Sequence, residues 1–412
     1  KELLIYPEIT LAQKNHAVYE RETIPSDTLF DNQWHHKNTG QTGGIVDADI
    51  DSPEAWDITS GGLTTHGDTI VVCIIEGNGV DINHADLKDN IWKNYAEIPD
   101  DGLDNDNNGY VDDFNGWHVI NLDDVIGAGS HGTRVAGMIG ATGNNVTGVS
   151  GVNWEVKMMI VQGQQASNEA TVIAAYTYPL KMRKRYNETL GQEGAFVVAT
   201  NSSWGIDNAS ATNSPLWCAM YDSMGKAGIL SAGATANDNA NVDVVHDIPT
   251  ECSSNWLIAV TNTTRNDARN GGAAYGKKSV DMGAPGTGIY SSLPSNNYGN
   301  QTGTSMATPH VAGSIAAMYA AACPALISAY KEHPDSIALL IRQYLLESAE
   351  WISAMNNLTA TNGRLNLYRA LMSLRRFNCD SCNFDITIDK VDIVCRYVNN
   401  GALSLGPIDN PS

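Results

Sequence analysis

Three residues of different chemistry each stand where a side chain can react. Glu76 ends the apolar run TIVVCII and precedes Gly-Asn-Gly, His131 begins HGTRVAGMIG, and Ser305 begins SMATPHVAGSIAAMYAAA. A carboxylate can orient an imidazole, and an imidazole can take the proton of a hydroxyl, which turns the hydroxyl oxygen into a nucleophile. The three residues could therefore carry out acyl transfer through a covalent intermediate.

Each residue alone also has an ordinary structural explanation. A glutamate at a strand end is usually a turn residue, a single histidine is usually a satisfied polar group, and a serine at a helix start is usually an N-cap. The combination is more informative, because acid, histidine and serine follow one another in the chain order of a known serine triad.

The elements that must position these side chains alternate between strands and helices. Apolar runs from Thr69, Ala195 and Trp256 are typical of strands buried on both faces of a parallel sheet. Between them, the stretches from Thr133 and after Asn168 are compatible with helices. The sequence predicts an α/β fold with a parallel sheet, in which reactive side chains lie just beyond the carboxyl ends of the strands.

The blocks around His131 and Ser305 resemble those of the subtilisin-like serine proteases. SHGTRVAG is similar to the family's HGTHVAG, with Arg134 in place of a histidine, and GTSMATPHVAG matches the family's serine block without a change. The resemblance extends over about residues 25–371. It implies a three-layer subtilisin-like fold with a central, mostly parallel sheet flanked by helices.

We expect three segments along the chain. A subtilisin-like peptidase domain over residues 25–375 would follow an N-terminal arm or prosegment remnant (1–24). The sequence pattern becomes alternating and Cys-bearing after about residue 375, so we expect residues 376–412 to form a C-terminal extension or the start of a further module.

The resemblance implies a role for each reactive residue. Ser305 would be the nucleophile, His131 the general base and then the general acid, and Glu76 the carboxylate that orients the imidazole. The family has Asp-x-Gly where this chain has Glu-Gly-Asn-Gly, so the acid is longer by one methylene. A glutamate can fill this role if the backbone retreats. Asp81 stays open as an alternative acid, although in the family pattern it corresponds to a second, structural aspartate.

The same resemblance indicates where a polypeptide substrate would bind. One segment would pair antiparallel with the substrate backbone, and it consists of Ser203, Trp204 and Gly205. The pocket for the side chain before the scissile bond would be shaped by Trp204 and by the small residues Ser231, Ala232 and Gly233. These residues predict an apolar preference.

The oxyanion hole departs from the family pattern. The family's asparagine follows a strand as AAGN, whereas SAGATAN places Ala234 at that position. Loss of a side-chain donor slows such an enzyme without abolishing it. Thr235 and Asn237 are candidate replacements, and the backbone N–H of Ser305 would be the other donor.

More than one function remains open. A serine endopeptidase is the predicted function, and the alternative is a catalytically impaired pseudoprotease that binds peptides or has a structural role. A serine-carboxyl peptidase is a third reading, but the intact block around His131 argues against it.

The acidic run DDGLDNDNNGYVDDFNGW resembles a calcium-binding loop, because it presents hard oxygen ligands around a glycine. It is not an EF-hand, since the twelfth position is Asn115. The predicted ligands of a structural calcium ion are Asp104, Asp106, Asn108, Tyr110 and Asp113.

The charge composition argues against one class of partner. The 412 residues include 25 Lys+Arg and 46 Asp+Glu, a net charge of −21 that repels phosphate backbones, so we expect no nucleic-acid partner. The longest apolar run is rich in alanine and contains Pro324, which predicts a core helix and no membrane span.

The chain opens without a signal peptide, as if trimmed, and its likeness to secreted bacterial subtilases predicts a secreted or cell-surface protein. The oligomeric state stays open.

The seven cysteines are an odd number, and Cys73 lies in an apolar strand pattern while three others crowd the C-terminal end, so two redox environments could coexist. Cys218 and Cys252 flank the same predicted strand and could form a disulfide. For Cys379, Cys382 and Cys395, we expect a disulfide and one thiol that is free or externally paired.

Overall fold

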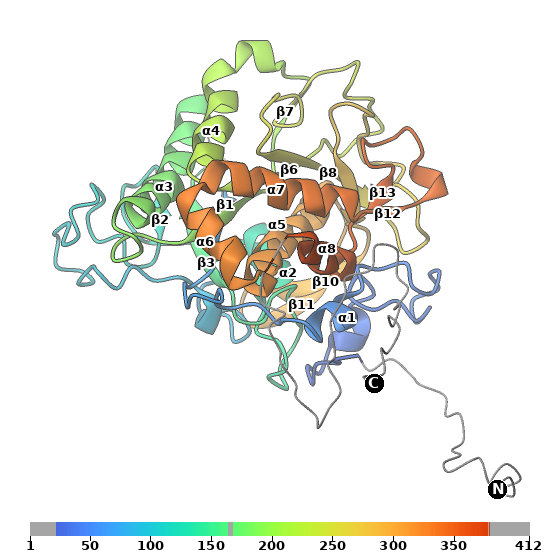
Figure 1. Cartoon of the computed structure of the whole chain (residues 1–412), viewed down its shortest axis with the longest axis horizontal. Coiled ribbons are helices and arrows are strands. Elements are labelled where there is room, and N and C mark those ends of the chain that lie inside the picture. The colour runs from blue at the N-terminus through green and yellow to red at the C-terminus, as the bar shows by residue number, and fades with distance from the viewer. Residues whose placement is uncertain (1–21, 164–167, 378, 380–412) are drawn as a thin grey trace, which may run out of the picture.

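A nine-stranded sheet forms the centre of the computed structural model, which describes residues 22–163, 168–377 and 379 (Figure 1). The strand order is β12-β13-β9-β8-β6-β4-β1-β3-β2, and neighbouring strands are parallel except for β12, which pairs antiparallel with β13. The strands are β1 (Val71–Glu76), β2 (Trp117–His118), β3 (Lys157–Gln162), β4 (Val197–Ser202), β6 (Leu230–Ala234), β8 (Leu257–Thr263), β9 (Met282–Pro285), β12 (Glu350–Trp351) and β13 (Gly363–Arg364).

Two short antiparallel sheets lie beside the central one. They pair β5 (Ile206–Asp207) with β7 (Asp247–Ile248), and β10 (Ile289–Leu293) with β11 (Asn297–Gln301).

Strand β1 is buried along its whole length, as its β-branched composition predicts. Val72 and Ile74 belong to one hydrophobic core, whereas Val71, Cys73 and Ile75 belong to a second one. Successive side chains of a strand point to opposite faces of the sheet, so the two cores lie on either side of it.

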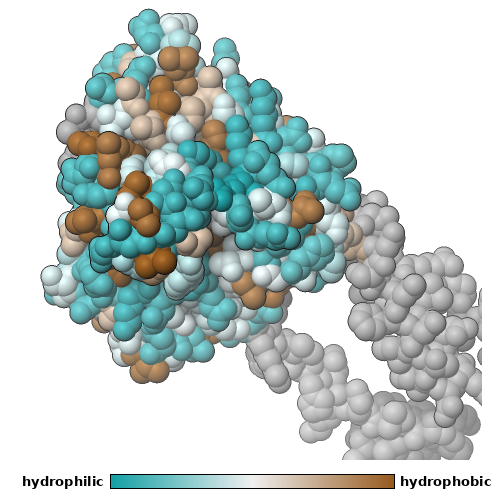
Figure 2. Space-filling view, turned by 90° about the vertical axis from the view of Figure 1, so that its left-hand side faces the viewer, coloured by the Kyte–Doolittle hydropathy of each residue, from teal (hydrophilic) through white to brown (hydrophobic). Residues whose placement is uncertain are grey.

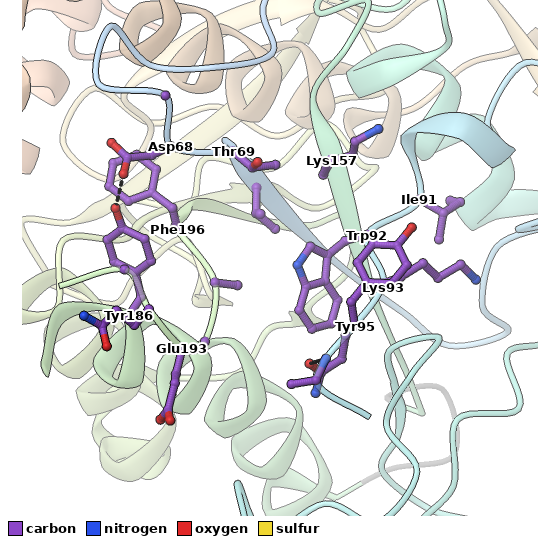
Figure 3. A pocket seen from close by; sticks show the side chains of 18 of the residues that line it. Asp68, Thr69, Ile91, Trp92, Lys93, Tyr95, Lys157, Tyr186, Glu193 and Phe196 are labelled. Carbon is purple, nitrogen blue, oxygen red and sulfur yellow. Dashed lines mark hydrogen bonds between the residues drawn. The ribbon is translucent and has the colours of Figure 1, made fainter. Parts of the chain in front are cut away.

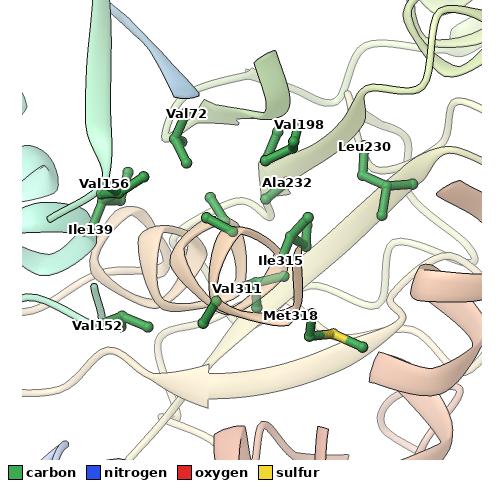
Figure 4. Close-up of a cluster of buried hydrophobic side chains, with 14 of the residues drawn as sticks. Val72, Ile139, Val152, Val156, Val198, Leu230, Ala232, Val311, Ile315 and Met318 are labelled. Atoms are coloured by element: carbon green, nitrogen blue, oxygen red, sulfur yellow. The ribbon is translucent and has the colours of Figure 1, made fainter. Parts of the chain in front are cut away.

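Helices cover both faces of the sheet. On one face, α2 (Ser130–Gly140) and α5 (Thr304–Ala321) contribute to the first core, and Figure 4 shows Val311, Ile315 and Met318 of α5 close to side chains of the sheet. On the other face, α3 (Glu169–Glu188) and α4 (Pro215–Lys226) contribute to the second core. The remaining helices are α1 (Ser52–Trp56), α6 (Pro324–Glu332), α7 (Pro334–Glu347) and α8 (Leu367–Ser373). The predicted three-layer α/β fold is therefore confirmed.

Two disulfides close loops between elements. Cys218 of α4 is bonded to Cys252, which confirms that expected pair. Cys379 is bonded to Cys323, just before α6, and so is paired outside the group of three C-terminal cysteines. Its partner was missed because residues 323 and 379 approach only in the folded chain. Cys382 and Cys395 lie outside the described residues.

The face that forms the left-hand side of Figure 1 is mainly hydrophilic and carries separate hydrophobic patches (Figure 2). Within the described residues, no single helix has the length and apolar character to cross a bilayer, and only the bent pair of α5 and α6 passes on those two criteria. Of these, α5 is almost entirely buried in the core. The predicted N-terminal arm and C-terminal extension lie almost wholly outside the described residues.

Candidate active site

Glu76 and His131 meet at the carboxyl end of the sheet. Glu76 is the last residue of β1, and its Oε2 lies 2.8 Å from Nδ1 of His131, the second residue of α2. Glu76 is only 3% exposed, and its other oxygen, Oε1, is buried without a hydrogen-bond partner. A Cβ at Gly132 would lie 2.2 Å from the carbonyl oxygen of Gly79, so glycine is required where α2 starts against the loop that follows β1.

Ser305 is the second residue of α5 and forms two hydrogen bonds with Ser203, the residue that follows β4. The Ser305 hydroxyl donates to the Ser203 carbonyl oxygen (3.1 Å), and the Ser203 hydroxyl donates to the Ser305 carbonyl oxygen (2.9 Å). That carbonyl is free within the helix because residue 309, which would donate to it, is a proline without an N–H.

The sheet register brings the Glu76–His131 pair close to the Ser203–Ser305 pair. Ile75 of β1 is the partner of Ser202 in β4, so Glu76 and Ser203 follow on neighbouring parallel strands, which lie about 4.8 Å apart. The indole N–H of Trp204 also donates to the carbonyl oxygen of Ile75 (2.8 Å). His131, bound to Glu76, and Ser305, bound to Ser203, therefore lie at the same edge of the sheet.

Within the described part of the chain, no hydrogen bond joins His131 to Ser305, since the serine hydroxyl donates to Ser203. Rotation of the serine side chain about its Cα–Cβ bond would redirect that hydroxyl. Catalytic hydrogen bonds are often long or misaligned in a free enzyme and form only in the substrate complex.

The environment of His131 favours its protonated form. Burial lowers the pKa of the imidazole and the Arg134 charge opposes protonation too, but the hydrogen bond and the charge of Glu76 outweigh both and raise the His131 pKa above its ordinary value. A carboxylate in this position stabilises the imidazolium that forms when a histidine accepts a serine proton.

Ser305 lines a cavity of about 120 Å³ between the ends of β4 and β6. One wall is formed by residues 203–205 and the other by residues 234–237, so Ser203, Trp204 and Gly205 lie where a substrate segment was predicted. The other predicted pocket residues lie deeper: Ser231 accepts a hydrogen bond from Thr200 inside the sheet, Ala232 is part of the first core, and Gly233 packs against Pro249.

Both candidate oxyanion residues line this cavity together with Ser305. The Oδ1 of Asn237 accepts from the backbone N–H of Thr304 (2.9 Å), so its Nδ2 remains as a possible donor. The carbonyl oxygen of Thr235 accepts from the Thr304 hydroxyl (2.6 Å), and the Thr235 hydroxyl is buried without a partner. Thr304 thus holds both candidate residues in place.

The acidic loop brings Asp104 and Asp106 together with Glu97. Carboxylate oxygens of these three residues lie within 4.8 Å of one another, and Oε2 of Glu97 is buried without a hydrogen-bond partner. Asn108 donates to Asp106 (3.2 Å) and to Asp113 (2.9 Å).

The other two predicted ligands contact the body of the protein. Asp113 accepts from the hydroxyl of Tyr178 (2.6 Å), and the Tyr110 ring packs edge-on against Trp117 and Tyr178. These contacts fix the loop against α3.

Sequence reasoning missed three acids. Glu97 precedes the acidic run by several residues, and only its acidic character could have signalled it. Asp207 and Asp247 also line the cavity beside Ser305. Asp207 follows the recognised segment by two residues, but nothing near Asp247 in the sequence points to the site.

A further cavity, of about 680 Å³, lies away from these residues. Figure 3 shows Tyr186 and Phe196 on one side of it and Trp92 and Tyr95 on the other. It is lined by the first residues of β1 and β3, so it opens at the amino ends of the strands. It is therefore separate from the site around Ser305.

Comparison with known proteins agrees with the geometry. A family profile described as "Subtilase family" matches residues 67–370. The chain is 27% identical over 325 residues to thermitase from Thermoactinomyces vulgaris, an alignment that covers 78% of this chain and 93% of that protein.

Two longer relatives match over only part of their length. Subtilisin-like protease 1 of Plasmodium falciparum is 29% identical over 324 residues, which cover 73% of this chain and 43% of that protein. An "Extracellular protease" of Xanthomonas campestris pv. campestris is 30% identical over 330 residues, with coverage of 75% and 51%. The chain thus spans less than half the length of the Plasmodium relative.

A solved structure of a protease from Pseudoalteromonas arctica has a similar fold. Its TM-score is 0.62 at 22% sequence identity, and the match covers 85% of this chain and 100% of that one.

Proposed function

Because the chain belongs to the subtilase family, we propose that it is a serine endopeptidase that cleaves polypeptides through an acyl-enzyme on Ser305. The observation that supports this most is the 2.8 Å contact of Glu76 with His131 at the sheet edge where Ser305 lies. Glu76 would take the place of the family's aspartate.

In this mechanism, Nε2 of His131 accepts the Ser305 proton while the serine oxygen attacks the peptide carbonyl carbon. Glu76 holds the imidazole by Nδ1 and stabilises its positive charge. His131 then gives the proton to the leaving amine, which departs and leaves an acyl-enzyme. A water molecule, deprotonated by His131, hydrolyses the ester and restores the serine.

The test of this function is digestion of an unfolded protein such as casein, with the new amino termini identified by mass spectrometry. An endopeptidase produces internal cleavages. Release of terminal residues only, or no cleavage by a folded sample, would contradict the proposal.

Asn237 is proposed as the side-chain donor of the oxyanion hole, beside the backbone N–H of Ser305. Its replacement by alanine should lower kcat by about 10²–10³, because the negative charge of the tetrahedral intermediate loses one fixed donor. Thr235→Val is the matched control, since it removes the other candidate hydroxyl at nearly constant size. A larger loss of kcat in Thr235→Val than in Asn237→Ala would assign the role to Thr235.

Activity should fall as the pH is lowered through the raised pKa of His131. The neutral imidazole is the form that accepts the serine proton, so kcat/KM is lost once His131 is protonated. The midpoint of this acidic limb should lie above about 6.5, the ordinary value for histidine. A pH profile of kcat/KM on an uncharged peptide measures it, and a midpoint well below 6.5 would contradict the effect of Glu76.

We also propose that the acidic loop binds calcium. Three clustered carboxylates with one unpartnered buried oxygen suit a hard divalent cation, and the predicted Asp104 and Asp106 are among them. Glu97 joins the predicted ligand set, while Asn108 and Asp113 lie next to it in the same hydrogen-bond network. Calcium would neutralise the cluster and fix the loop against the body of the protein.

Removal of calcium should therefore lower the melting temperature. A ligand present at 100 times its Kd stabilises the folded state by about 2.7 kcal/mol. Calorimetric scans with calcium and with excess chelator measure the shift, and Glu97→Gln should reduce it because the loop loses one carboxylate. An equal shift in Glu97→Gln would place the bound calcium elsewhere.

Secretion is proposed on two grounds. Disulfides such as Cys218–Cys252 persist in oxidising compartments, and one relative is named an extracellular protease. The proposed partners are polypeptide substrates.

A further inference from the structure

The cavity beside Ser305 is negatively charged. Asp207 and Asp247 line it, and no Lys, Arg or His of the described residues does. Across the described part of the chain, neither carboxylate forms an ion pair with a cation. The other lining residues are neutral, so two unpaired carboxylates dominate the field of the cavity.

The short sheet of β5 and β7 holds these carboxylates together. Asp207 pairs directly with Asp247 across the two antiparallel strands. Like charges in this arrangement destabilise a sheet, and a cation bound between them would relieve the repulsion. The arrangement is tight, because a Cβ at Gly205 would lie 2.2 Å from the carbonyl oxygen of Ile248.

Asp247 is buried but can ionise near neutral pH. Asp247 is 1% exposed, and burial raises its pKa to about 6, against the opposing hydrogen bond from Thr250 and with a further upward effect of Asp207. Asp207 is exposed to solvent. The buried hydroxyl of Thr235, which has no partner, adds a further oxygen on the cavity wall.

We propose that this cavity binds the cationic side chain of a lysine or arginine placed immediately before the scissile bond, an inference that rests on the proposed endopeptidase function. Such a side chain would enter between residues 203–205 and residues 234–237 while its carbonyl carbon faces Ser305. The ammonium or guanidinium group would then meet the two carboxylates. This specificity would differ from the apolar preference that the sequence indicated.

The test uses peptide pairs that differ only in charge at this position, lysine against norleucine and arginine against citrulline, at pH 8. Norleucine matches the alkyl chain of lysine, so the ratio of kcat/KM isolates the charge. Hydrogen bonds to charged groups predict a ratio of roughly 10 to 100 in favour of the cation. A ratio near one in the unmodified enzyme would overturn the inference.

Variants of the exposed acid test the assignment without disturbing the buried one. Asp207→Asn should lower the lysine-to-norleucine ratio several-fold, and Asp207→Lys should bring it below one. Asp222→Asn, on α4 and outside the cavity, is the matched control and should keep the ratio of the unmodified enzyme. Ratios unchanged by both Asp207 variants would overturn the inference.

The failure of this inference can be told from the failure of the proposed function. Cleavage without discrimination would overturn only the inference, whereas no cleavage of any peptide would contradict the function. In that second case, the same peptides are titrated calorimetrically into Ser305→Ala. Tighter binding of the lysine peptide would support the cationic pocket, and equal binding would overturn it.

Discussion

Replacement of Ser305 by alanine should lower kcat by roughly a millionfold, the loss found when the nucleophile of subtilisin is removed. Attack requires an oxygen that both faces the substrate carbonyl and reaches His131. The neighbouring hydroxyl of Ser203 is not expected to take its place, because it donates to the Ser305 carbonyl oxygen.

The measurement is the rate of cleavage of a fluorogenic peptide by purified variants. KM or Kd for the peptide should change little, since the hydroxyl contributes to the transition state more than to binding. Ser314→Ala is a control on the same helix, where the hydroxyl donates to the His310 carbonyl oxygen, away from the site. Activity of Ser305→Ala within a factor of ten of the unmodified enzyme would remove Ser305 as the nucleophile.

Replacement of Glu76 by glutamine should lower kcat by about 10⁴, as when the acid of a serine triad is changed to its amide. A glutamine that kept its carbonyl oxygen on Nδ1 of His131 would bury its NH₂ group where Oε1 of Glu76 now has no partner. The reversed amide would donate to Nδ1 and so fix the wrong tautomer. Neither orientation supplies the negative charge that stabilises the imidazolium.

Glu76→Asp is the matched control, because it keeps the charge and removes one methylene. A displaced carboxylate should cost about 10²-fold, so activity should lie between that of the unmodified enzyme and that of Glu76→Gln. Steady-state kinetics on the same peptide compare the three proteins. Full activity in Glu76→Gln would show that Glu76 does not act through His131, and Asp81 would become the acid to test.

The parts of the fold that could be predicted are those with long, regular patterns. The run ending at Glu76 is short, continuous and β-branched, which favours a strand buried on both faces, and the small residues after Ser305 suit a helix packed against neighbours on every side. The position of the reactive side chains could then be predicted, because the carboxyl ends of parallel strands meet at one edge of a sheet.

The parts that could not be predicted depend on contacts between distant segments. Strands β5 and β7 have two residues each, too few for any periodic signal, so the pairing of Asp207 with Asp247 was invisible in the sequence. The pairing of Cys323 with Cys379 likewise depends on how α6 packs. The choice of Asn237 required knowledge of the path of the chain after β6.

The most direct test of the account is labelling with a serine-reactive fluorophosphonate, followed by intact-mass spectrometry of the folded protein in calcium. We predict one adduct per chain, its absence in Ser305→Ala, and much slower labelling in Glu76→Gln, because Glu76 and His131 together activate the serine. No adduct in a folded sample free of bound inhibitory segments would contradict the account and favour a peptide-binding pseudoprotease.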